Sequence, residues 1–322
     1  MLSCLSVAIV FGLCYKLSMN PDLKTMLVLN PFAGKNKGLK ALAAIQELLG
    51  SRLQKMDVRI SEYAGHAFQI GREAASQGYE RILTIGGDGT PFEVVNGLYA
   101  EGRPRQAIEL GMIPAGTGNS FLRDFSVVSW RQAVESILAG RSRKVDLVEI
   151  SYQRDKKEIK QYYLNILGVG LIADILKLTN EKLKGFGSLG YSLAVLMRLA
   201  KGMRNRMLLT VDGEKMEIAD SALVISNSKF TGGGMKIAPM ADTQDGKVDM
   251  VIFAGVNRRD ILHIFSRIFK GTHVTHPRVK TMRAEAIEID SCPQQLLMAD
   301  GELLGMTPLR LKVLPGELRI LA

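Results

Sequence analysis

The 322-residue sequence is 47% hydrophobic and 23% charged and contains 32 glycines, close to the average of soluble globular proteins. This composition excludes a disordered chain, a collagen-like repeat and a coiled coil, and the length allows two domains of about 100–200 residues each. The net charge of +10 favours anionic partners. The 6% aromatic content argues against nucleic acid, because a stacking surface needs aromatic side chains between the basic ones.

Residues 1–24 are interpreted as an N-terminal extension. The apolar run from Leu2 to Tyr15 is shorter than the roughly 20 residues that span a bilayer, and it lacks the basic start and the cleavage site of a secretory signal. It is an interfacial anchor, a weak signal-like segment, or an extension upstream of a start at Met19 or Met26. We favour the last two interpretations, because the apolar run that begins at Met26 reads directly as a first buried strand.

Residues 25–143 alternate short apolar runs with helical patterns, which is typical of βαβ units on a parallel sheet. The pattern predicts strands at 25–30, 58–62, 81–85 and 109–113, and helices at 39–49, 67–76 and 92–98. The first domain is therefore expected to be a doubly wound α/β domain.

The second half of the chain has longer alternating segments and is predicted to be mostly β. Strands are expected at 145–152, 160–167, 208–211, 222–226, 248–253 and 287–289. Helices are expected at 189–203 and 259–270, each apolar on one face and basic on the other. The end of the chain, 309–322, is predicted as a hairpin around Pro315-Gly316 that could return to the first domain. Three scattered cysteines without a C-x-x-C pair support neither a disulfide framework nor a zinc site, and fit a reducing compartment.

Glycine-rich segments follow three of the predicted strands. The first is G-G-D-G-T at Gly86, Gly87, Asp88, Gly89 and Thr90, which leaves a strand and enters a helix. Glycines let backbone N–H groups approach phosphate oxygens, the helix N-terminus adds positive charge, and Asp88 could hold the magnesium of a nucleotide. An ordinary strand-to-helix turn is the alternative interpretation.

The other two segments would lie at the same edge of the sheet. P-A-G-T-G-N ends in Gly116, Thr117, Gly118 and Asn119, and N-P-F-A-G-K contains Asn30 and Lys35. Loops that leave neighbouring strand ends face one crevice, where α/β sheets bind ligands. The sequence contains neither a Walker-type phosphate loop nor a dinucleotide fingerprint.

In combination, these segments with Glu93, Asn96-Gly97-Leu98 and Asp300-Gly301-Glu302 resemble the diacylglycerol kinase catalytic superfamily, which includes soluble bacterial lipid kinases and sphingosine kinases. The resemblance covers the chain from about Thr25 to its end. It implies an ATP-binding α/β domain at 25–143 and a lipid-binding antiparallel β-sandwich domain at 144–308. Its cofactors would be ATP and Mg²⁺, and its location would be cytoplasmic and peripheral on the membrane.

The resemblance also implies roles for single residues. The G-G-D-G-T and G-T-G-N loops would bind ATP phosphates and magnesium, and His66 would lie near the adenine, although a helix-start role for His66 is equally open. Asp300 would act as the base on the lipid hydroxyl, Asp88 would be catalytic and bind the metal, and Glu302 would belong to the magnesium and water network. Asp245 and Val248 match a loop that holds a structural magnesium in some relatives.

Two residues depart from the family pattern. Ser120 stands where the second loop usually has aspartate, and Arg123 and Asp124 are the nearby residues that could compensate. Pro91 follows G-G-D-G-T, where a leucine or valine is usual, and suits a first helical turn.

The leading interpretation is an ATP-dependent lipid kinase that phosphorylates diacylglycerol or a related lipid alcohol. The alternatives are an NAD kinase, which shares the G-G-D-G-T loop, and a catalytically inactive nucleotide-binding relative, which Ser120 would favour. We expect reversible binding to anionic membranes through the basic amphipathic helix at 189–206, a homodimer is left open, and no nucleic acid is expected. For Asp300-Gly301-Glu302, the alternative to a catalytic motif is a surface hairpin turn.

Overall fold

The computed structural model describes residues 19–155, 157–183, 205–232 and 234–322. The predicted helix at 189–203 and the N-terminal extension up to residue 18 lie outside the described residues. Within this described part, no helix is both long and apolar enough to cross a bilayer.

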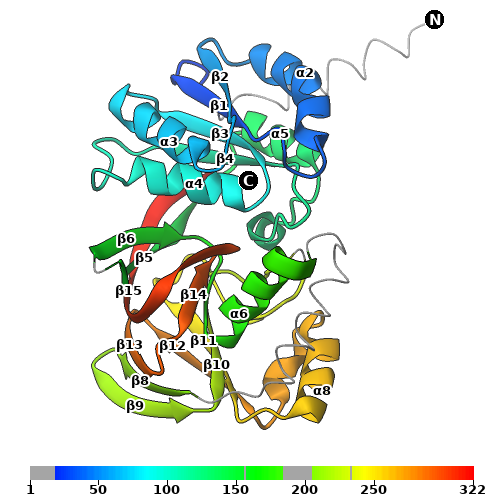
Figure 1. Cartoon of the computed structure of the whole chain (residues 1–322). Coiled ribbons are helices and arrows are strands. Elements are labelled where there is room, and N and C mark those ends of the chain that lie inside the picture. The colour runs from blue at the N-terminus through cyan, green and yellow to red at the C-terminus, as the bar shows by residue number, and fades with distance from the viewer. Residues whose placement is uncertain (1–18, 156, 184–204, 233) are drawn as a thin grey trace, which may run out of the picture.

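The first domain is a parallel sheet covered by helices on both faces (Figure 1). Its strands are β1 (Thr25–Leu29), β2 (Met56–Ile60), β3 (Arg81–Gly86) and β4 (Glu109–Pro114), in the order β2-β1-β3-β4. Its helices are α2 (Lys37–Gly50), α3 (His66–Ser76), α4 (Gly89–Leu98) and α5 (Trp130–Leu138), and a short 3₁₀ helix η1 (Phe121–Phe125) follows β4. This confirms the doubly wound α/β architecture.

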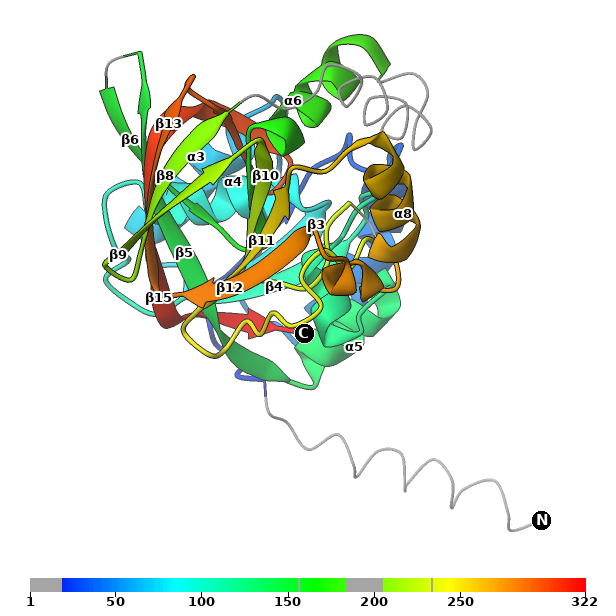
Figure 2. The ribbon, with the colours of Figure 1, turned by 90° about the horizontal axis from the view of Figure 1, so that it is seen from below.

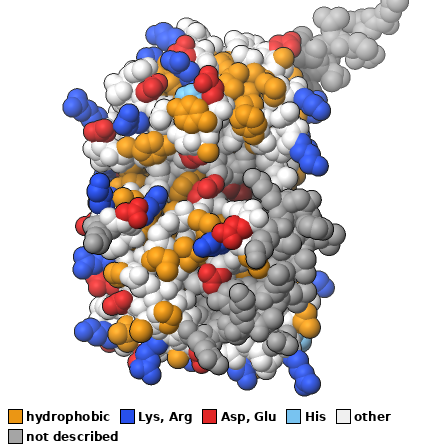
Figure 3. All heavy atoms as spheres, in the orientation of Figure 1, with side chains coloured by type: hydrophobic (Ala, Val, Ile, Leu, Met, Phe, Trp, Pro, Cys, Tyr) orange, Lys and Arg blue, Asp and Glu red, His pale blue; other side chains and the backbone are white. Residues whose placement is uncertain are grey.

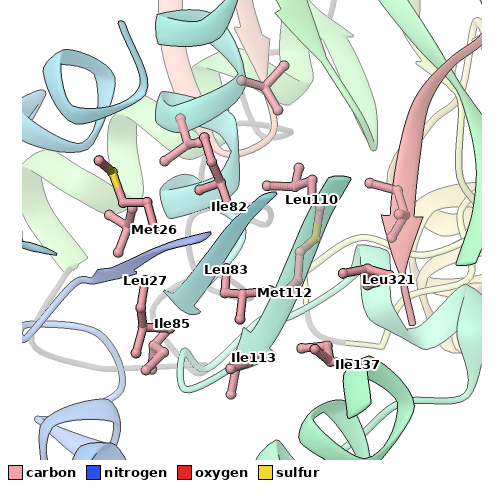
Figure 4. Packing of buried hydrophobic residues seen from close by; sticks show 14 of the residues in the cluster. Met26, Leu27, Ile82, Leu83, Ile85, Leu110, Met112, Ile113, Ile137 and Leu321 are labelled. Atoms are coloured by element: carbon pink, nitrogen blue, oxygen red, sulfur yellow. The ribbon is translucent and has the colours of Figure 1, made fainter. Parts of the chain in front are cut away.

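The core of this domain is formed by side chains of the central strands and the covering helices. Figure 4 shows Leu27, Leu83 and Met112 from three neighbouring strands packed with Ile137 of α5. These apolar runs are buried on both faces of a parallel sheet, which is why they read as continuous hydrophobic segments in the sequence. The sheet therefore holds its three glycine-rich loops on a rigid base.

The second domain is an antiparallel β-sandwich, as the resemblance implied (Figure 2). Its strands are β5 (Ser142–Arg154), β6 (Lys157–Tyr163), β7 (Ile166–Val169), β8 (Arg206–Val211), β9 (Glu214–Ala219), β10 (Ser221–Ser226), β11 (Val248–Ala254), β12 (Val279–Ala284), β13 (Ala286–Cys292), β14 (Leu296–Ala299) and β15 (Glu302–Leu321). One sheet has the order β12-β11-β10-β7-β14-β15, and the other continues from β15 through β13, β8 and β9 and through β5 and β6. A buried apolar cluster lies between them.

Helices cover the outer face of the β10–β11–β12 part of this sandwich. They are α6 (Leu171–Leu178), which continues into a π-helical turn at Thr179–Leu183, and α8 (Arg258–Ile268), followed by the short η4 (Thr272–Thr275). Both α6 and α8 contribute to one apolar cluster with β10 and β11.

Two predictions about strands are corrected. The predicted strand at 160–167 is two strands, β6 and β7, because the backbone N–H groups of Leu164, Asn165 and Ile166 bind a buried carboxylate at the break. The predicted C-terminal hairpin around Pro315-Gly316 is wrong: β15 is one strand that pairs antiparallel with β5 on both sides of Pro315. A register shift between Leu314 and Leu318 shows a bulge at that point instead of a reversal.

The last residues of β15 join the first domain. Arg319, Ile320 and Leu321 pair in parallel with β4, at Glu109, Leu110 and Gly111. The strand that begins at Glu302 in the second domain therefore ends in the sheet of the first. This continuity fixes the turn before Glu302 relative to the glycine-rich loops.

Candidate functional site

The three glycine-rich loops contact one another through their backbones. A Cβ on Gly116 would lie 2.4 Å from the Cα of Gly87, and one on Gly34 would lie 1.9 Å from the carbonyl oxygen of Ala115. The backbone N–H groups of Ala115 and Gly116 both donate to the carbonyl of Gly86, over 2.8 and 3.1 Å. Glycine is thus required by close approach of two backbones, and the predicted shared crevice is formed.

The loop at 116–119 is closed by its own asparagine. The side-chain amide of Asn119 donates to the carbonyl of Gly116 over 2.8 Å, and its Oδ1 accepts from the N–H of Gly116 over 3.2 Å. Asn119 has a φ of 48°, which this residue type tolerates better than most. Thr117 is exposed at the tip of the loop, while Asn119 supports the loop from inside.

A hollow of about 220 Å³, including space open to solvent, lies beside these loops. Gly87, Asp88 and Asn119 line it, with Met112 and Ile113 of β4 among its apolar residues. Two of the predicted polar residues, Asp88 and Asn119, therefore line one small hollow together with the carboxyl ends of β3 and β4.

The carboxylate of Asp88 is bound by the start of η1. Its oxygens accept the N–H of Ser120 over 2.7 and 2.9 Å, and Oδ1 accepts the N–H of Phe121 over 3.4 Å. Burial raises the pKa of Asp88 above its ordinary value, and the hydrogen bonds from Ser120 and Phe121 and the positive charge of Arg123 oppose this rise. Asp88 thus links the G-G-D-G-T loop to the G-T-G-N loop.

Ser120, which stands where the family usually has aspartate, has a structural role. Both its backbone and its hydroxyl group hydrogen-bond to Asp88, so the serine orients that carboxylate. Asp124 does not join them: its Oδ2 accepts the backbone N–H of Lys229 in the second domain, over 3.0 Å. Of the two residues expected to compensate, only Arg123 acts on Asp88.

Asp300 lies in the two-residue turn between β14 and β15, with φ values of 50° at Asp300 and 91° at Gly301. The motif is therefore a hairpin turn, as the alternative interpretation held, but Asp300 is only 8% exposed. Its Oδ1 accepts the N–H groups of Asn165 and Ile166 over 2.9 and 3.0 Å, and its Oδ2 accepts that of Leu164 over 2.8 Å. Sequence reasoning missed this role, because backbone donors leave no signal in the residue types.

Burial raises the pKa of Asp300 to about 7, against the opposing effect of its three hydrogen bonds. The negative charge of Asp88, in the first domain, adds to the rise.

The side chain of Glu302, the first residue of β15, lies beside the N-terminus of α4. Its Oε1 is 3.3 Å from the point where a Cβ on Gly89 would be. Partial loss of water raises the pKa of Glu302, and the negative charge of Glu93 adds to this rise. Figure 3 shows acidic side chains at the level where the two domains meet. Glu302 is thus the carboxylate of the D-G-E motif that faces the N-terminal end of α4.

Two predicted nucleotide ligands have structural roles at α3. Glu93 accepts the N–H groups of Gly65 and Ala67 over 3.1 and 3.2 Å, so its carboxylate caps the N-terminus of α3. His66 is the first residue of α3; its Nδ1 accepts the N–H of Glu62 over 3.0 Å, and its ring stacks on Tyr63. The structure thus places His66 at the start of a helix.

The first loop has a similar division of roles. Asn30 accepts the N–H of Phe32 over 3.0 Å, which shapes the turn after β1. Lys35 is exposed, with a φ of 59°. The lysine is therefore available to a ligand at this edge, whereas the asparagine supports the loop.

Asp245 and Val248 belong to the second domain, Asp245 in the loop before β11 and Val248 as the first residue of that strand. Oδ1 of Asp245 accepts the N–H of Lys247 over 3.0 Å, and its other oxygen forms an ion pair with Arg283. No group of three or more acidic, histidine or cysteine side chains that could hold a metal occurs among the described residues. The arginine already neutralises this carboxylate, so the geometry gives no support to the predicted structural magnesium.

Comparison with known proteins agrees with this arrangement. Residues 24–150 match the diacylglycerol kinase catalytic domain, and residues 165–322 match the YegS C-terminal NAD kinase beta sandwich-like domain. The chain is 31% identical to the protein named "Putative lipid kinase YtlR" of Bacillus subtilis, over 91% of this chain and 97% of that protein. It is 28% identical to a diacylglycerol kinase of Mycobacterium tuberculosis, over 92% and 94% of the two chains.

Solved structures show the same fold. A diacylglycerol kinase of Bacillus anthracis superposes with a TM-score of 0.73 at 24% identity, over 94% of this chain and 98% of the other. Yeast NADH kinase superposes with a TM-score of 0.54 at 12% identity, over 94% and 83%.

Proposed function

Because this chain belongs to the diacylglycerol kinase catalytic family and is a kinase, we propose that it transfers the γ-phosphoryl group of ATP to the hydroxyl group of a lipid. The acceptor is diacylglycerol or a related lipid alcohol. The observation that carries this proposal is the position of Glu302, a residue of the second domain, at the N-terminus of α4, the helix that follows the phosphate-binding loop.

The nucleotide phosphates bind where the two glycine loops meet. The backbones of Gly87 and Gly116 meet there without side chains between them, and α4 begins at Gly89 of the same loop. Arg123, whose charge acts on Asp88, and the exposed Lys35 add positive charge to this edge. Phosphoryl transfer depends mainly on positioning and electrostatic stabilisation, which these groups supply.

The residues present fit a magnesium ion brought in with the nucleotide. Mg²⁺ in kinases is usually held by one or two carboxylates together with substrate phosphates, instead of by a cage of protein ligands. Asp88 is the carboxylate that would hold it together with the nucleotide phosphates. When bound, the ion neutralises charge on the transferring phosphoryl group.

We assign the proton transfer to Glu302 and a positioning role to Asp300. All three backbone hydrogen bonds at the break between β6 and β7 go to the Asp300 carboxylate, so its orientation is already fixed by the fold. Glu302 follows two residues later, at the start of β15, and its carboxylate lies beside Gly89 at the N-terminus of α4. The acceptor hydroxyl gives its proton to the Glu302 carboxylate while the hydroxyl oxygen bonds to the γ-phosphorus, and the bond from that phosphorus to the β,γ-bridging oxygen breaks to release ADP.

The test is incubation of the purified chain with γ-labelled ATP and a total lipid extract, with and without Mg²⁺. The proposal expects a labelled lipid whose formation requires Mg²⁺ and falls by a factor of about 100 or more in Asp88→Ala, which removes the carboxylate between the two loops. Parallel reactions with NAD distinguish the related kinase class. Labelled NADP without any labelled lipid would overturn the assignment, as would nucleotide binding without turnover on every lipid fraction.

A further inference from the structure

The outward face of α8 carries apolar and basic side chains together. Leu262 is 61% exposed and Phe269, directly after the helix, is 54% exposed. These residues are seven positions apart, close to two helical turns, so they lie on one side of the helix. Arg259 and Lys270 are exposed beside them. We define this set of four residues as the α8 face.

The inward side of α8 is anchored. Ile264 and Ile268 are buried in the apolar cluster that also contains residues of α6 and Met298 of β14. The helix start is fixed by Asn257, which accepts the N–H groups of Arg259 and Asp260, while the Asp260 carboxylate accepts the N–H of Asn257. Leu262 and Phe269 are thus held in the exposed position by a well-packed helix.

The charge around this face is positive. The stretch from Arg258 to Lys270 contains four basic residues and a single acidic one, Asp260. The Asp260 carboxylate is already paired with Arg278, over 3.1 Å. Leu262 and Phe269 are therefore bordered by basic side chains, and Asp260, the one acidic residue of this stretch, is already paired. A helix with exposed Leu and Phe and a basic border has the character of an interfacial membrane helix.

The position of α8 in the fold agrees with this character. Figures 1 and 2 both place α8 on the same side of the second domain as α6, and β8 and β9 on the opposite side. Met298, two residues before Asp300 in the chain, belongs to the apolar cluster beneath α8. The apolar cluster beneath α8 thus extends to β14, the strand that precedes the D-G-E turn. A bilayer that α8 contacts would lie on this side of the sheet.

We propose that the α8 face docks on an anionic lipid bilayer, with Leu262 and Phe269 entering the acyl boundary and Arg259 and Lys270 binding the headgroups. The proposal rests on the proposed function, since an enzyme that phosphorylates a bilayer lipid must reach the bilayer surface. Both attractions contribute: burial of the Leu262 and Phe269 side chains in the acyl boundary, and electrostatic attraction of Arg259 and Lys270 to the anionic headgroups.

The test is co-sedimentation of the full chain with sucrose-loaded vesicles of phosphatidylcholine alone or with phosphatidylglycerol. We expect binding to the anionic vesicles and little to the neutral ones. The double variant Leu262→Gln, Phe269→Gln should lose at least about tenfold in partition coefficient, as follows from the apolar burial. Arg259→Gln with Lys270→Gln should lose a similar factor on anionic vesicles only.

The matched control is Leu208→Gln. Leu208 is 55% exposed on β8, on the side of the domain away from α8, and this variant should bind as the wild type does. Sedimentation of the Leu262 and Phe269 double variant at the wild-type level would overturn the proposal. So would a change from dimer to monomer in this variant during gel filtration, because a second copy would then cover the face.

Vesicle binding is measured without turnover, so it separates the two proposals. If the double variant lost vesicle binding and no preparation had kinase activity, the proposed function would be wrong and the docking face would stand. Conversely, wild-type sedimentation of the variant with lipid phosphorylation intact would remove the docking face alone.

Discussion

Gly87 and Gly116 are in backbone contact across two loops that follow different strands: a Cβ on Gly116 would lie 2.4 Å from the Cα of Gly87 and 3.0 Å from its nitrogen. The obstacle is backbone, so no side-chain rotation can relieve it. The two glycine-rich loops can approach this closely only because Gly116 has no side chain.

Gly116→Ala should consequently push the two loops apart. We expect nucleotide affinity to fall at least about tenfold and the free energy of unfolding to fall by about 1–3 kcal/mol, as for other overpacked sites. Calorimetric titration with the nucleotide and urea unfolding measure these two quantities. Gly50→Ala is the control, because a Cβ there has no neighbour within 4 Å. Unchanged affinity in Gly116→Ala would show that the contact does not shape the nucleotide site.

The roles assigned to Asp300 and Glu302 can be separated. Glu302→Gln should slow turnover by about 10²- to 10⁴-fold, the usual contribution of a general base, without changing the melting temperature. Asp300→Asn should instead lower stability by about 1–3 kcal/mol, because the new amide group would face one of the three backbone N–H donors.

The measurements are the turnover rate at saturating lipid and the thermal midpoint of each variant. If folded Asp300→Asn turned over about two orders of magnitude more slowly than the wild type while Glu302→Gln stayed close to it, the role of base would return to Asp300.

Glu93 should act on stability more than on nucleotide binding. Each of its two carboxylate oxygens accepts a backbone N–H group at the start of α3. In Glu93→Gln, one of these two N–H groups would face the side-chain NH₂ group, which is itself a donor. The expected loss is about 1–2 kcal/mol in the free energy of unfolding, from loss of the cap. The KM for the nucleotide should change by less than about threefold. Exposed Glu73→Gln on the same helix is the control. A tenfold rise in KM with unchanged stability would make Glu93 the nucleotide ligand that the sequence predicted.

Asp249 should make stability fall as pH rises. It is 1% exposed, neither carboxylate oxygen has a hydrogen-bond partner, and burial raises its pKa from 3.8 to about 6. The folded chain therefore binds more protons than the unfolded chain between these values, and stability decreases with pH across that window by at most about 3 kcal/mol. Arg283, 3.7 Å away, reduces this cost.

Asp249→Asn removes the group that titrates. The variant should melt several degrees above the wild type at pH 8, and the difference should vanish near pH 4, where both side chains are neutral. Calorimetric melting from pH 4 to pH 8 measures this, with exposed Glu214→Gln in parallel. A variant that is less stable than the wild type at pH 8 would contradict the sign.

The sequence by itself determined the α/β domain and the meeting of its glycine-rich loops at one edge of the sheet. Short apolar runs such as Met26–Leu29 are local signals, and the glycines after β3 and β4 stand at the ends of those strands. Parallel strands bring their carboxyl ends to one edge, so the meeting of Gly87 with Gly116 follows from pattern and topology.

Only the tertiary structure decided which polar groups remain available to a ligand. Asp300 is bound by backbone groups at Leu164 and Ile166, more than 130 residues earlier in the chain, and Glu93 by groups 26 and 28 residues away. The tertiary structure also decided the course of β15. Pro315-Gly316 is a local signal for a turn, but the residues on both sides of it pair with β5, so the chain does not reverse there. A carboxylate has the same residue type whether it binds a ligand or a distant backbone N–H group, and a Pro-Gly pair reads the same whether or not the chain reverses there. Their roles were therefore decided by tertiary contacts, which a local sequence pattern does not contain.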